Sequence, residues 1–463
     1  MAFKLNRQDQ LTVVRYLERY AEPVIHAFDT GMFETDSLDA DLFHIFDTVI
    51  VIPIYDEAEE QLQHFLDFQK HSETPRSTLM VWVFNAPESS IGSSSLQRTQ
   101  TVFKSLVLKT NANKLVEGLY LSNTQASLQI LFVDRCHEHL ISDKQGVGLA
   151  RKLGMDLALN LVYQQYVKTQ KWCHWLYSTD ADVSLPEGYA LLPAKENTTA
   201  CIYPFKHSPE LGFERAITEY EFSLHYYVES LKKAGSPYAF HTIGSLIVVS
   251  SVAYAQVRGI PKRAGAEDFY LLNKLAKLGK IESLCSPIIQ VSGRPSHRVP
   301  FGTGPALVKI NSQYQNSEAF RIYHPRIFTL LMYVLNSVSA IEQSNAEENI
   351  LLSHLTAKLP KPLEEKVVAE ILLDLGWNKQ AAHLQKLKTA EAIRQAFHVW
   401  FDAFITLRFI HELRDRLYPN IALTELPKFI SKYTSEISTE ALNGEALRGT
   451  DFDYTAWLKT LGI

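Results

Sequence analysis

A short apolar run, residues 172–177, is followed closely by two aspartates, Asp180 and Asp182, that stand one residue apart. The run is rich in aromatic residues, which favours a buried strand over a helix. Open α/β sheets bind their ligands at the carboxyl ends of the strands, and two carboxylates there can converge on a hard divalent cation. Mg²⁺ and Mn²⁺ prefer oxygen ligands and complete their coordination with water and substrate phosphates. The pair therefore predicts a Mg²⁺ or Mn²⁺ site beside bound phosphate groups.

Two other Asp-x-Asp pairs occur in the chain, Asp39 with Asp41 and Asp451 with Asp453. A bare pair of this kind arises by chance about once in a chain of this size, so its surroundings must decide. Both of these pairs stand in polar stretches, and we interpret them as solvated loops or caps. The middle pair differs because it closes an apolar strand.

A later loop combines cationic side chains with glycine. Residues 292–304 contain Arg294, His297 and Arg298 together with three glycines. The two arginines can reach a bound diphosphate, and His297 is a candidate third ligand of the metal. Loops of this composition are also ordinary surface turns, so that interpretation stays open.

The elements that would position these side chains alternate between strands and helices. Continuous apolar runs predict strands at residues 47–54, 78–84 and 128–133, and helical patterns follow at 97–109 and 146–169. This alternation is typical of a mostly parallel sheet flanked by helices. Further strands are expected at 199–205, 246–249 and 287–291. Further helices are expected at 213–233 and 267–278, the latter starting with Glu267 and Asp268, whose acidic side chains suit a helix start.

The length of 463 residues is enough for two or three domains. We expect a helical N-terminal arm at 1–45, an α/β domain at 46–310 and an all-α C-terminal domain at 311–463. The net charge of −5 argues against a general nucleic-acid surface. The four cysteines are widely spaced, which suits a reducing compartment. Because neither a signal peptide nor a membrane span is recognisable, we expect a cytoplasmic protein.

Four motifs occur in an order that resembles the family-2 glycosyltransferases, whose GT-A fold binds nucleotide-diphospho-sugars. They are Pro53-Ile54-Tyr55-Asp56-Glu57 after the first strand, Gly148-Leu149-Ala150-Arg151-Lys152-Leu153-Gly154 at a helix start, Asp180-x-Asp182, and Glu267-Asp268 at a later helix start. The resemblance covers roughly residues 46–300 and implies a GT-A-like, mostly parallel mixed sheet. The arm and the C-terminal helices lie outside it.

The resemblance also implies roles for the matching residues. Asp180 and Asp182 would face the ribose and the metal-bound diphosphate, and Asp268 would be the general base that deprotonates the acceptor hydroxyl. Contacts with the nucleotide-sugar would come from Pro53, Tyr55, Glu57 and Arg151. The second strand ends at Asn85 where the family has paired aspartates, and we expect Asn85 to meet the nucleotide in their place.

We therefore expect a metal-dependent enzyme that moves a sugar from a nucleotide-diphospho-sugar to a hydroxyl of a glycan or small molecule, with inversion and one addition at a time. A retaining enzyme of the same fold and an inactive GT-A-fold scaffold remain alternatives. A nucleotidyltransferase is disfavoured, because its first strand is followed by a glycine-rich phosphate loop and this chain has Tyr55-Asp56-Glu57 there. The C-terminal helices could bind the acceptor, close over the donor or form a homodimer.

Overall fold

The computed structural model describes residues 5–28, 43–68, 70, 75–125, 127–296, 298, 302–339 and 348–428. His297 and the Asp-x-Asp pairs at 39–41 and 451–453 lie outside these ranges, so what the sequence predicts for them stays a prediction. The chain divides into two compact units. One contains Met1–Glu210 and Thr242–Pro305, and the other contains Leu211–His241 and Ala306–Ile463.

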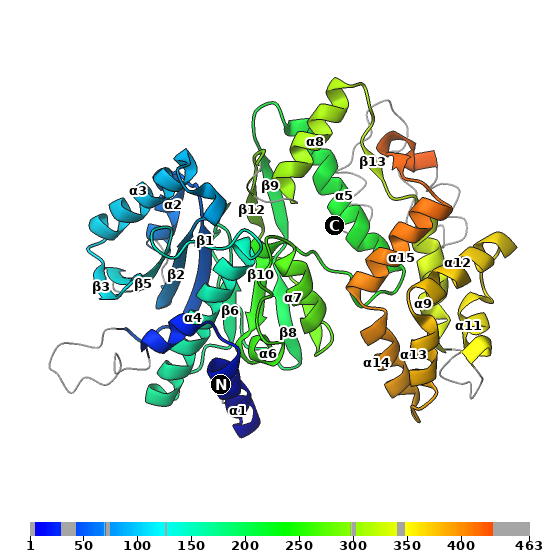
Figure 1. Cartoon of the computed structure of the whole chain (residues 1–463), viewed down its shortest axis with the longest axis horizontal. Helices are drawn as coiled ribbons and strands as arrows, with labels where there is room; N and C mark the ends of the chain where they lie inside the picture. Colours follow the sequence, from blue (N-terminus) through cyan, green and yellow to red (C-terminus); the bar gives the residue numbers. More distant parts are fainter. Residues whose placement is uncertain are drawn as a thin grey trace. The chain divides into compact units, whose positions relative to one another are not determined.

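The first unit is built on a mixed sheet that has nine strands within the described residues (Figure 1). In spatial order these are β11 (Lys280–Ser283), β8 (Thr198–Ile202), β10 (Ile247–Ser250), β6 (Trp175–Ser178), β1 (Thr48–Ile54), β2 (Thr78–Asn85), β5 (Leu128–Arg135), β4 (Leu119–Gln125) and β3 (Asn113–Val116). All of these strands except β10 and β4 point the same way. The predicted α/β class with a mostly parallel mixed sheet is confirmed.

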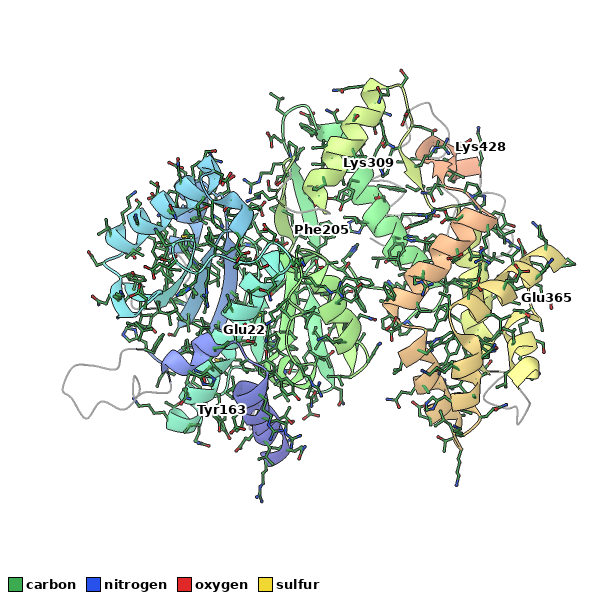
Figure 2. The ribbon with its side chains drawn as sticks, viewed as in Figure 1. Glu22, Tyr163, Phe205, Lys309, Glu365 and Lys428 are labelled. Atoms are coloured by element: carbon green, nitrogen blue, oxygen red, sulfur yellow. The ribbon has the colours of Figure 1, made fainter. Side chains whose placement is uncertain are left out.

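Helices cover both faces of the centre of this sheet, which explains why β1 and β2 are buried at every position and are apolar except at Thr48, Thr78 and Asn85. Val83 of β2 faces Gly154, on the helix at 146–169, whereas the next residue, Phe84, packs edge-on against Phe103. Side chains of the sheet and of the covering helices fill the space between these layers (Figure 2). The covering helices are α4 (Gly146–Thr169) on one face and α2 (Glu59–Leu66) and α3 (Ser94–Lys109) on the other.

A second sheet, with three strands in the described part of the chain, is formed by the segments that follow β6, β8 and β11. Its order is β7, β12, β9, with bounds Val183–Ser184, Ile289–Gly293 and Phe205–Pro209. β7 begins directly after Asp182, and β12 ends directly before Arg294. The pairing of β7 with β12 therefore brings a residue after β6 close to the loop predicted to bind phosphate. The other short elements of this unit are η1 (Pro23–Phe28), η2 (Glu88–Ser90), η3 (Gly244–Leu246), α6 (Ser251–Gln256) and α7 (Glu267–Leu275).

The N-terminal helix α1 (Arg7–Arg19) is anchored by a buried carboxylate on α4. Asp156 accepts hydrogen bonds from the hydroxyls of Tyr16 and Tyr254, at 2.5 and 2.8 Å, and from the Nζ of Lys152 at 2.8 Å. On α1 the side chain of Leu11 is 55% exposed, whereas Val13 and Leu17 are buried. Tyr16, which carries the anchoring hydroxyl, also faces the core.

The second unit is mainly helical, as predicted for the C-terminal part. Its elements are α5 (Glu214–Lys233), α8 (Thr303–Gln315) from Ala306 onward, β13 (Arg321–Ile322), α9 (Pro325–Asn336), α11 (Glu348–Thr356), α12 (Pro362–Asp374), α13 (Trp377–Leu384), α14 (Ala390–Trp400), α15 (Ala403–Arg416), β14 (Ile421–Ala422) and η4 (Leu423–Glu425). α5 groups with this unit, whereas the sequence placed it with the sheet, because its apolar residues Phe222 and Tyr226 pack in the helical core. In the described part of the chain, no helix is long and apolar enough to cross a membrane.

Candidate functional site

Three neighbouring parallel strands end at the same edge of the large sheet, and the predicted site residues follow them. β1 is followed by Tyr55 and Glu57, β2 ends at Asn85, and β6 is followed by Asp180 and Asp182. Ligands of open α/β sheets bind at this edge, since the strand ends leave a crevice there. All of these residues belong to the first unit.

Arg151 on α4 ties two other elements to the strand end. Its Nη1 donates to the Oγ of Ser178 at 2.9 Å, its Nη2 donates to the carboxylate of Asp180, and its Nε donates to the Oε1 of Glu267 at 2.9 Å. The guanidinium is buried, and its two acidic partners compensate the charge that burial would otherwise penalise. Arg151 therefore holds the first aspartate of the pair and the start of α7 together.

Glycines make this close arrangement sterically feasible. A methyl group at Gly148 would lie 2.5 Å from the carbonyl oxygen of Arg263, which accepts the N–H of Gly148 at 3.0 Å. A methyl group at Gly244 would lie 2.6 Å from the Nη2 of Arg151. The first turn of α4 can thus lie directly against the segment that leads into α7, and the guanidinium of Arg151 passes over Gly244.

The second aspartate belongs to a separate ionic cluster with Glu57 and two arginines. Glu57 accepts hydrogen bonds on Oε1 from Arg294, at 2.6 Å, and from Arg298. The Oδ2 of Asp182 lies 3.3 Å from Arg294 and 3.7 Å from Arg298. Arg298 also donates to the carbonyl oxygen of Tyr55 at 2.7 Å. The loop after β12 is therefore bonded to the segments that follow β1 and β6.

Two carboxyl groups of the site have pKa values well above the ordinary range of aspartate. Burial, with the nearby charges of Asp180 and Glu57, raises the pKa of Asp182 to about 6, against the opposing effect of the two arginines. Burial and the adjacent Glu267 raise the pKa of Asp268 to about 7, although Arg151 and the N–H of Phe269 lower it. Perturbed carboxyl groups of this kind are typical of functional sites.

The balance of charge in the site suits a divalent cation. Its ionisable side chains comprise five carboxylates and three guanidinium groups: Glu57, Asp180, Asp182, Glu267, Asp268, Arg151, Arg294 and Arg298. The side chains of Asp180 and Asp182 are 34% and 21% exposed, so both can still be reached by a ligand. The Oε2 of Glu57 is buried without a hydrogen-bond partner. Excess negative charge on accessible carboxylate oxygens fits Mg²⁺ or Mn²⁺.

The remaining predicted residues occupy less open positions. Pro53 lies inside β1, opposite Val83 of β2, and is buried. Asn85 donates its side-chain N–H groups to the carbonyl oxygens of Ile54 and Val83, both at 3.1 Å, so it braces the ends of β1 and β2. Tyr55 is partly exposed at the end of β1. His297, the predicted third metal ligand, lies outside the described residues.

Two residues of the site were not predicted to be there. Glu267 was interpreted as part of a helix cap, but its carboxylate binds Arg151. Gly244 stands in the sequence Thr242-Ile243-Gly244-Ser245, and only its nearness to the Arg151 side chain shows why a larger residue would not fit. The glycine itself was the available signal, since glycine inside an apolar stretch often marks close approach of another group.

Comparison with known proteins adds the following. No family model matches the chain, and no curated protein matches it. Among solved structures, residues 1–349 of TarS from S. aureus, in complex with UDP-GlcNAc, match at 12% identity and a TM-score of 0.34, covering 80% of this chain and 92% of that one. The mannosyltransferase PcManGT from Pyrobaculum calidifontis, in complex with GDP-Man and Mn²⁺, matches at 14% identity and a TM-score of 0.32, covering 88% and 99%.

At these TM-scores the likeness to solved structures carries no argument about the site, which rests on the residues of this chain.

Proposed function

We propose that this protein transfers a sugar from a nucleotide-diphospho-sugar to a hydroxyl group of an acceptor, with inversion and one addition at a time. The observation that carries the proposal is the cluster at the carboxyl edge of the sheet, where Arg294 and Arg298 join Asp182 to Glu57. It combines carboxylates for a cation with guanidinium groups for a diphosphate, which are the two kinds of group that a nucleotide-sugar donor requires.

Asp180 and Asp182 would hold Mg²⁺ or Mn²⁺, with His297 as a further candidate ligand. A divalent cation bound there would neutralise charge that develops on the leaving diphosphate. Asp182 is suited to this task because it is accessible and its present partners are two arginine side chains rather than backbone groups. The buried Arg151 would keep the carboxylate of Asp180 oriented toward the donor.

Arg294 and Arg298 would bind the diphosphate itself. Guanidinium groups form strong, charge-assisted hydrogen bonds with phosphate oxygens. Glu57 supports both arginines from the buried side, since its Oε1 accepts from each of them. Because Glu57 stands just after the end of β1, it holds the two arginines in position before the donor binds. This positioning reduces the entropy lost on binding.

Asp268 would act as the general base. A carboxylate must be ionised to accept the proton of the attacking hydroxyl, and it works best when its pKa is close to the working pH. Burial and the adjacent Glu267 raise the pKa of Asp268 to about 7, which meets that requirement. The neighbouring Glu267 is held by Arg151, so the two carboxylates at the start of α7 have separate tasks.

The test is the release of nucleoside diphosphate from a panel of nucleotide-sugars, UDP-GlcNAc and GDP-mannose included, with Mn²⁺ and a mixture of glycan acceptors. We expect one donor to be cleaved, the cleavage to be lost in Asp182→Asn, and the rate to fall about 10²- to 10⁴-fold in Asp268→Asn with donor binding retained. The matched control is Glu196→Gln, which neutralises an exposed carboxylate elsewhere in the same unit and should cleave the donor like the unaltered chain.

Two results would decide against this function. Donor binding with the same cleavage rate in Asp268→Asn would remove Asp268 from the reaction. If no nucleotide-sugar binds in the presence of Mn²⁺, the chain is better explained as a GT-A-fold scaffold. The anomeric configuration of the product, read by proton NMR, distinguishes inversion from retention. A cytoplasmic location and a homodimer through the C-terminal helices belong to the same proposal.

A further inference from the structure

A second group of metal-binding side chains lies at the end of β5, and the sugar-transfer site does not use it. It consists of Asp134, Cys136 and His137, whose ligand atoms all lie within 4.8 Å of one another. The Nδ1 of His137 is 2.8 Å from the Oδ2 of Asp134, and the Sγ of Cys136 is 3.4 Å from the Oδ1 of Asp134. The sulfur and the Nδ1 are 3.5 Å apart.

The local backbone explains how four consecutive residues bring three ligands together. The Oδ1 of Asp134 accepts the N–H groups of Cys136, at 3.0 Å, and of His137, at 3.2 Å, so the chain turns tightly as β5 ends. Such a turn needs only the carboxylate and two backbone N–H groups. It accounts for Asp134 but requires neither a thiol nor an imidazole at the next positions, and both of these side chains point to the same carboxylate.

The chemistry of the three groups suits one class of metal. Zinc binds thiolate, imidazole and carboxylate at about 2.0 to 2.3 Å with tetrahedral geometry, so its ligand atoms stand about 3.2 to 3.7 Å apart. With the Oδ1 of Asp134 as the ligand oxygen, its distance to the sulfur is 3.4 Å and the sulfur lies 3.5 Å from the Nδ1, both within that range. The Nδ1 lies 3.0 Å from the same oxygen, which is shorter, so this pair would move apart by a few tenths of an ångström when a metal binds. One thiolate, one carboxylate and one neutral imidazole also balance a charge of two. Magnesium and calcium are disfavoured because they avoid sulfur.

We propose that Asp134, Cys136 and His137 form a binding site for a divalent transition metal, with zinc as the ion that the ligand set fits best. This proposal does not rest on the proposed sugar transfer, which uses oxygen ligands at the ends of β1 and β6.

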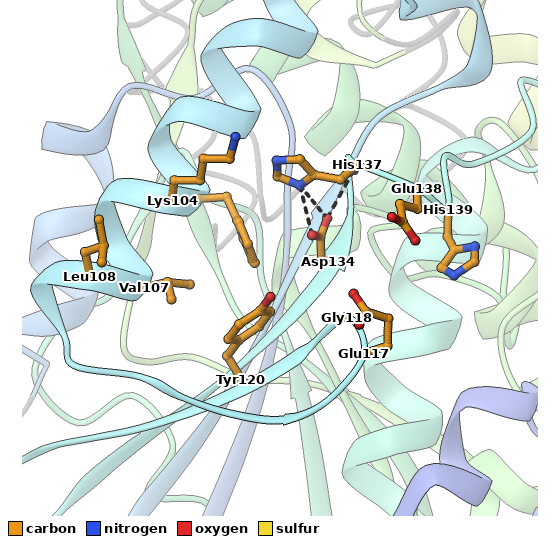
Figure 3. Close-up of a pocket in the computed structure, with 11 residues that line it drawn as sticks. Lys104, Val107, Leu108, Glu117, Gly118, Tyr120, Asp134, His137, Glu138 and His139 are labelled. Carbon is orange, nitrogen blue, oxygen red and sulfur yellow. Dashed lines mark hydrogen bonds and ion pairs between the residues drawn. The ribbon is translucent and has the colours of Figure 1, made fainter.

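The fourth coordination position would be reached from a neighbouring cavity of about 410 Å³ (Figure 3). Asp134 and His137 line this cavity, whereas Cys136 does not line it and is fully buried. In Figure 3, Asp134 and His137 point toward one another at the cavity wall, with Lys104 of α3 nearby. A metal with three protein ligands and an accessible fourth position can take water or a small anionic ligand.

Metal binding at this site must displace protons. The ligand form of cysteine is the thiolate, and binding is therefore expected to release protons and to weaken as the pH falls.

The experiment is a titration of the chelator-treated full chain with Co²⁺, which replaces zinc in such sites and gives a thiolate-to-cobalt charge-transfer band. We expect the band in the unaltered chain, its disappearance on addition of Zn²⁺, and its absence in Cys136→Ser. Competition with a chromophoric chelator should show Zn²⁺ affinity falling by more than about tenfold in His137→Gln, since even changes outside the ligand shell cost that much.

Two controls separate this site from the rest of the chain. Cys285→Ser removes an exposed cysteine and should keep the band, as should Asp182→Asn, which alters the proposed donor site. The proposal is overturned if the unaltered chain gives no thiolate band, or if the band survives in Cys136→Ser. If Cys136→Ser does not fold, unchanged Zn²⁺ affinity in His137→Gln overturns it in the same way.

Discussion

Glu57 positions two cationic side chains with a single carboxylate oxygen. Its Oε1 accepts from Arg294 and Arg298, while both arginines also face Asp182. In the donor site that we propose, the oxygens of a diphosphate would take the place of Asp182 as partner of the arginines, and Asp182 would then become available to a cation. The cluster is thus expected to exchange partners on donor binding rather than to move as a whole.

The contribution of Arg298 can be measured directly. Replacing it by alanine removes a charge-assisted hydrogen bond, and such bonds contribute about 1.5 to 3 kcal/mol. We predict that Arg298→Ala weakens the binding of nucleoside diphosphate by about 10- to 150-fold in isothermal titration calorimetry. Arg298→Lys keeps the charge but loses the planar guanidinium group. Its affinity for nucleoside diphosphate should lie between that of the unaltered chain and that of Arg298→Ala. Equal affinities in all three chains would exclude Arg298 from diphosphate binding.

If Asp268 is the general base, as we propose, the activity should depend on pH. The group is a base only when ionised, and burial with Glu267 raises its pKa to about 7. The ionised fraction, and with it kcat/KM, should therefore rise as the pH increases through about 7, and should fall below it. A pH profile of kcat/KM for the cleaved donor tests this prediction. A profile that stays flat across neutral pH, or that falls as the pH rises, would contradict the assignment.

Among the elements, α4 is held against the segment before α7 by the absence of a side chain at Gly148. Gly148→Ala would place a methyl group 2.5 Å from the backbone carbonyl oxygen of Arg263. Because a backbone atom cannot rotate away, we predict a loss of about 1 to 3 kcal/mol in unfolding free energy, measured by urea denaturation. Val167→Ala, at an exposed position of the same helix, is the matched control and should change stability by less than about 0.5 kcal/mol.

The attachment of α1 provides a second test at this scale. Asp156→Ala would leave the ammonium group of Lys152 buried without its ionic partner and would remove the hydrogen bonds of two tyrosine hydroxyls. Breaking a buried ion pair from one side costs about 3 to 5 kcal/mol. We predict a loss of this size in unfolding free energy and faster proteolytic cleavage at α1. Unchanged cleavage would show that apolar contacts alone hold the helix.

The elements with continuous apolar runs were predicted well, and the short polar ones were not. β1, β2, β5 and α4 lie within two residues of their predicted bounds, since their burial imposes a clear pattern. The hairpin of β3 and β4 and the edge strand β11 were missed. β3 and β11 have no fully buried residue among their positions, so no alternation marks them. The link from Glu57 to Arg298 spans 241 residues and leaves no local signal at all.

At the scale of the whole molecule, each of the two units contains buried ion pairs of its own. In the helical unit, Arg326 and Glu364 form a bidentate ion pair, with Nε 3.0 Å from Oε1 and Nη2 2.9 Å from Oε2, and both side chains are 2% exposed. The sequence predicted a helical C-terminal part but placed α5 with the sheet. The amphipathic pattern of α5 shows that one face of the helix is buried, but it does not show which other elements cover that face. For this reason the sequence could not predict to which unit α5 belongs.

This organisation predicts that the two units respond separately to a destabilising change. Glu364→Ala should lower the unfolding free energy of the helical unit by about 3 to 5 kcal/mol, because it removes the carboxylate that forms a buried ion pair with the guanidinium of Arg326. In differential scanning calorimetry one transition should move down, while nucleoside diphosphate still binds at temperatures below it. Loss of nucleotide binding in a folded Glu364→Ala variant would contradict separate behaviour.

The central claim, a metal-dependent donor site at the carboxyl edge of the sheet, is tested most directly by thermal unfolding with uridine, guanosine, thymidine and cytidine diphosphates, with and without Mn²⁺. A ligand at 100 times its dissociation constant stabilises the native state by about 2.7 kcal/mol. We predict that one nucleotide raises the melting temperature only when Mn²⁺ is present, that Asp182→Asn abolishes the shift, and that Glu196→Gln keeps it. A chain that no nucleotide stabilises with Mn²⁺, or a shift that survives in Asp182→Asn, would contradict the claim.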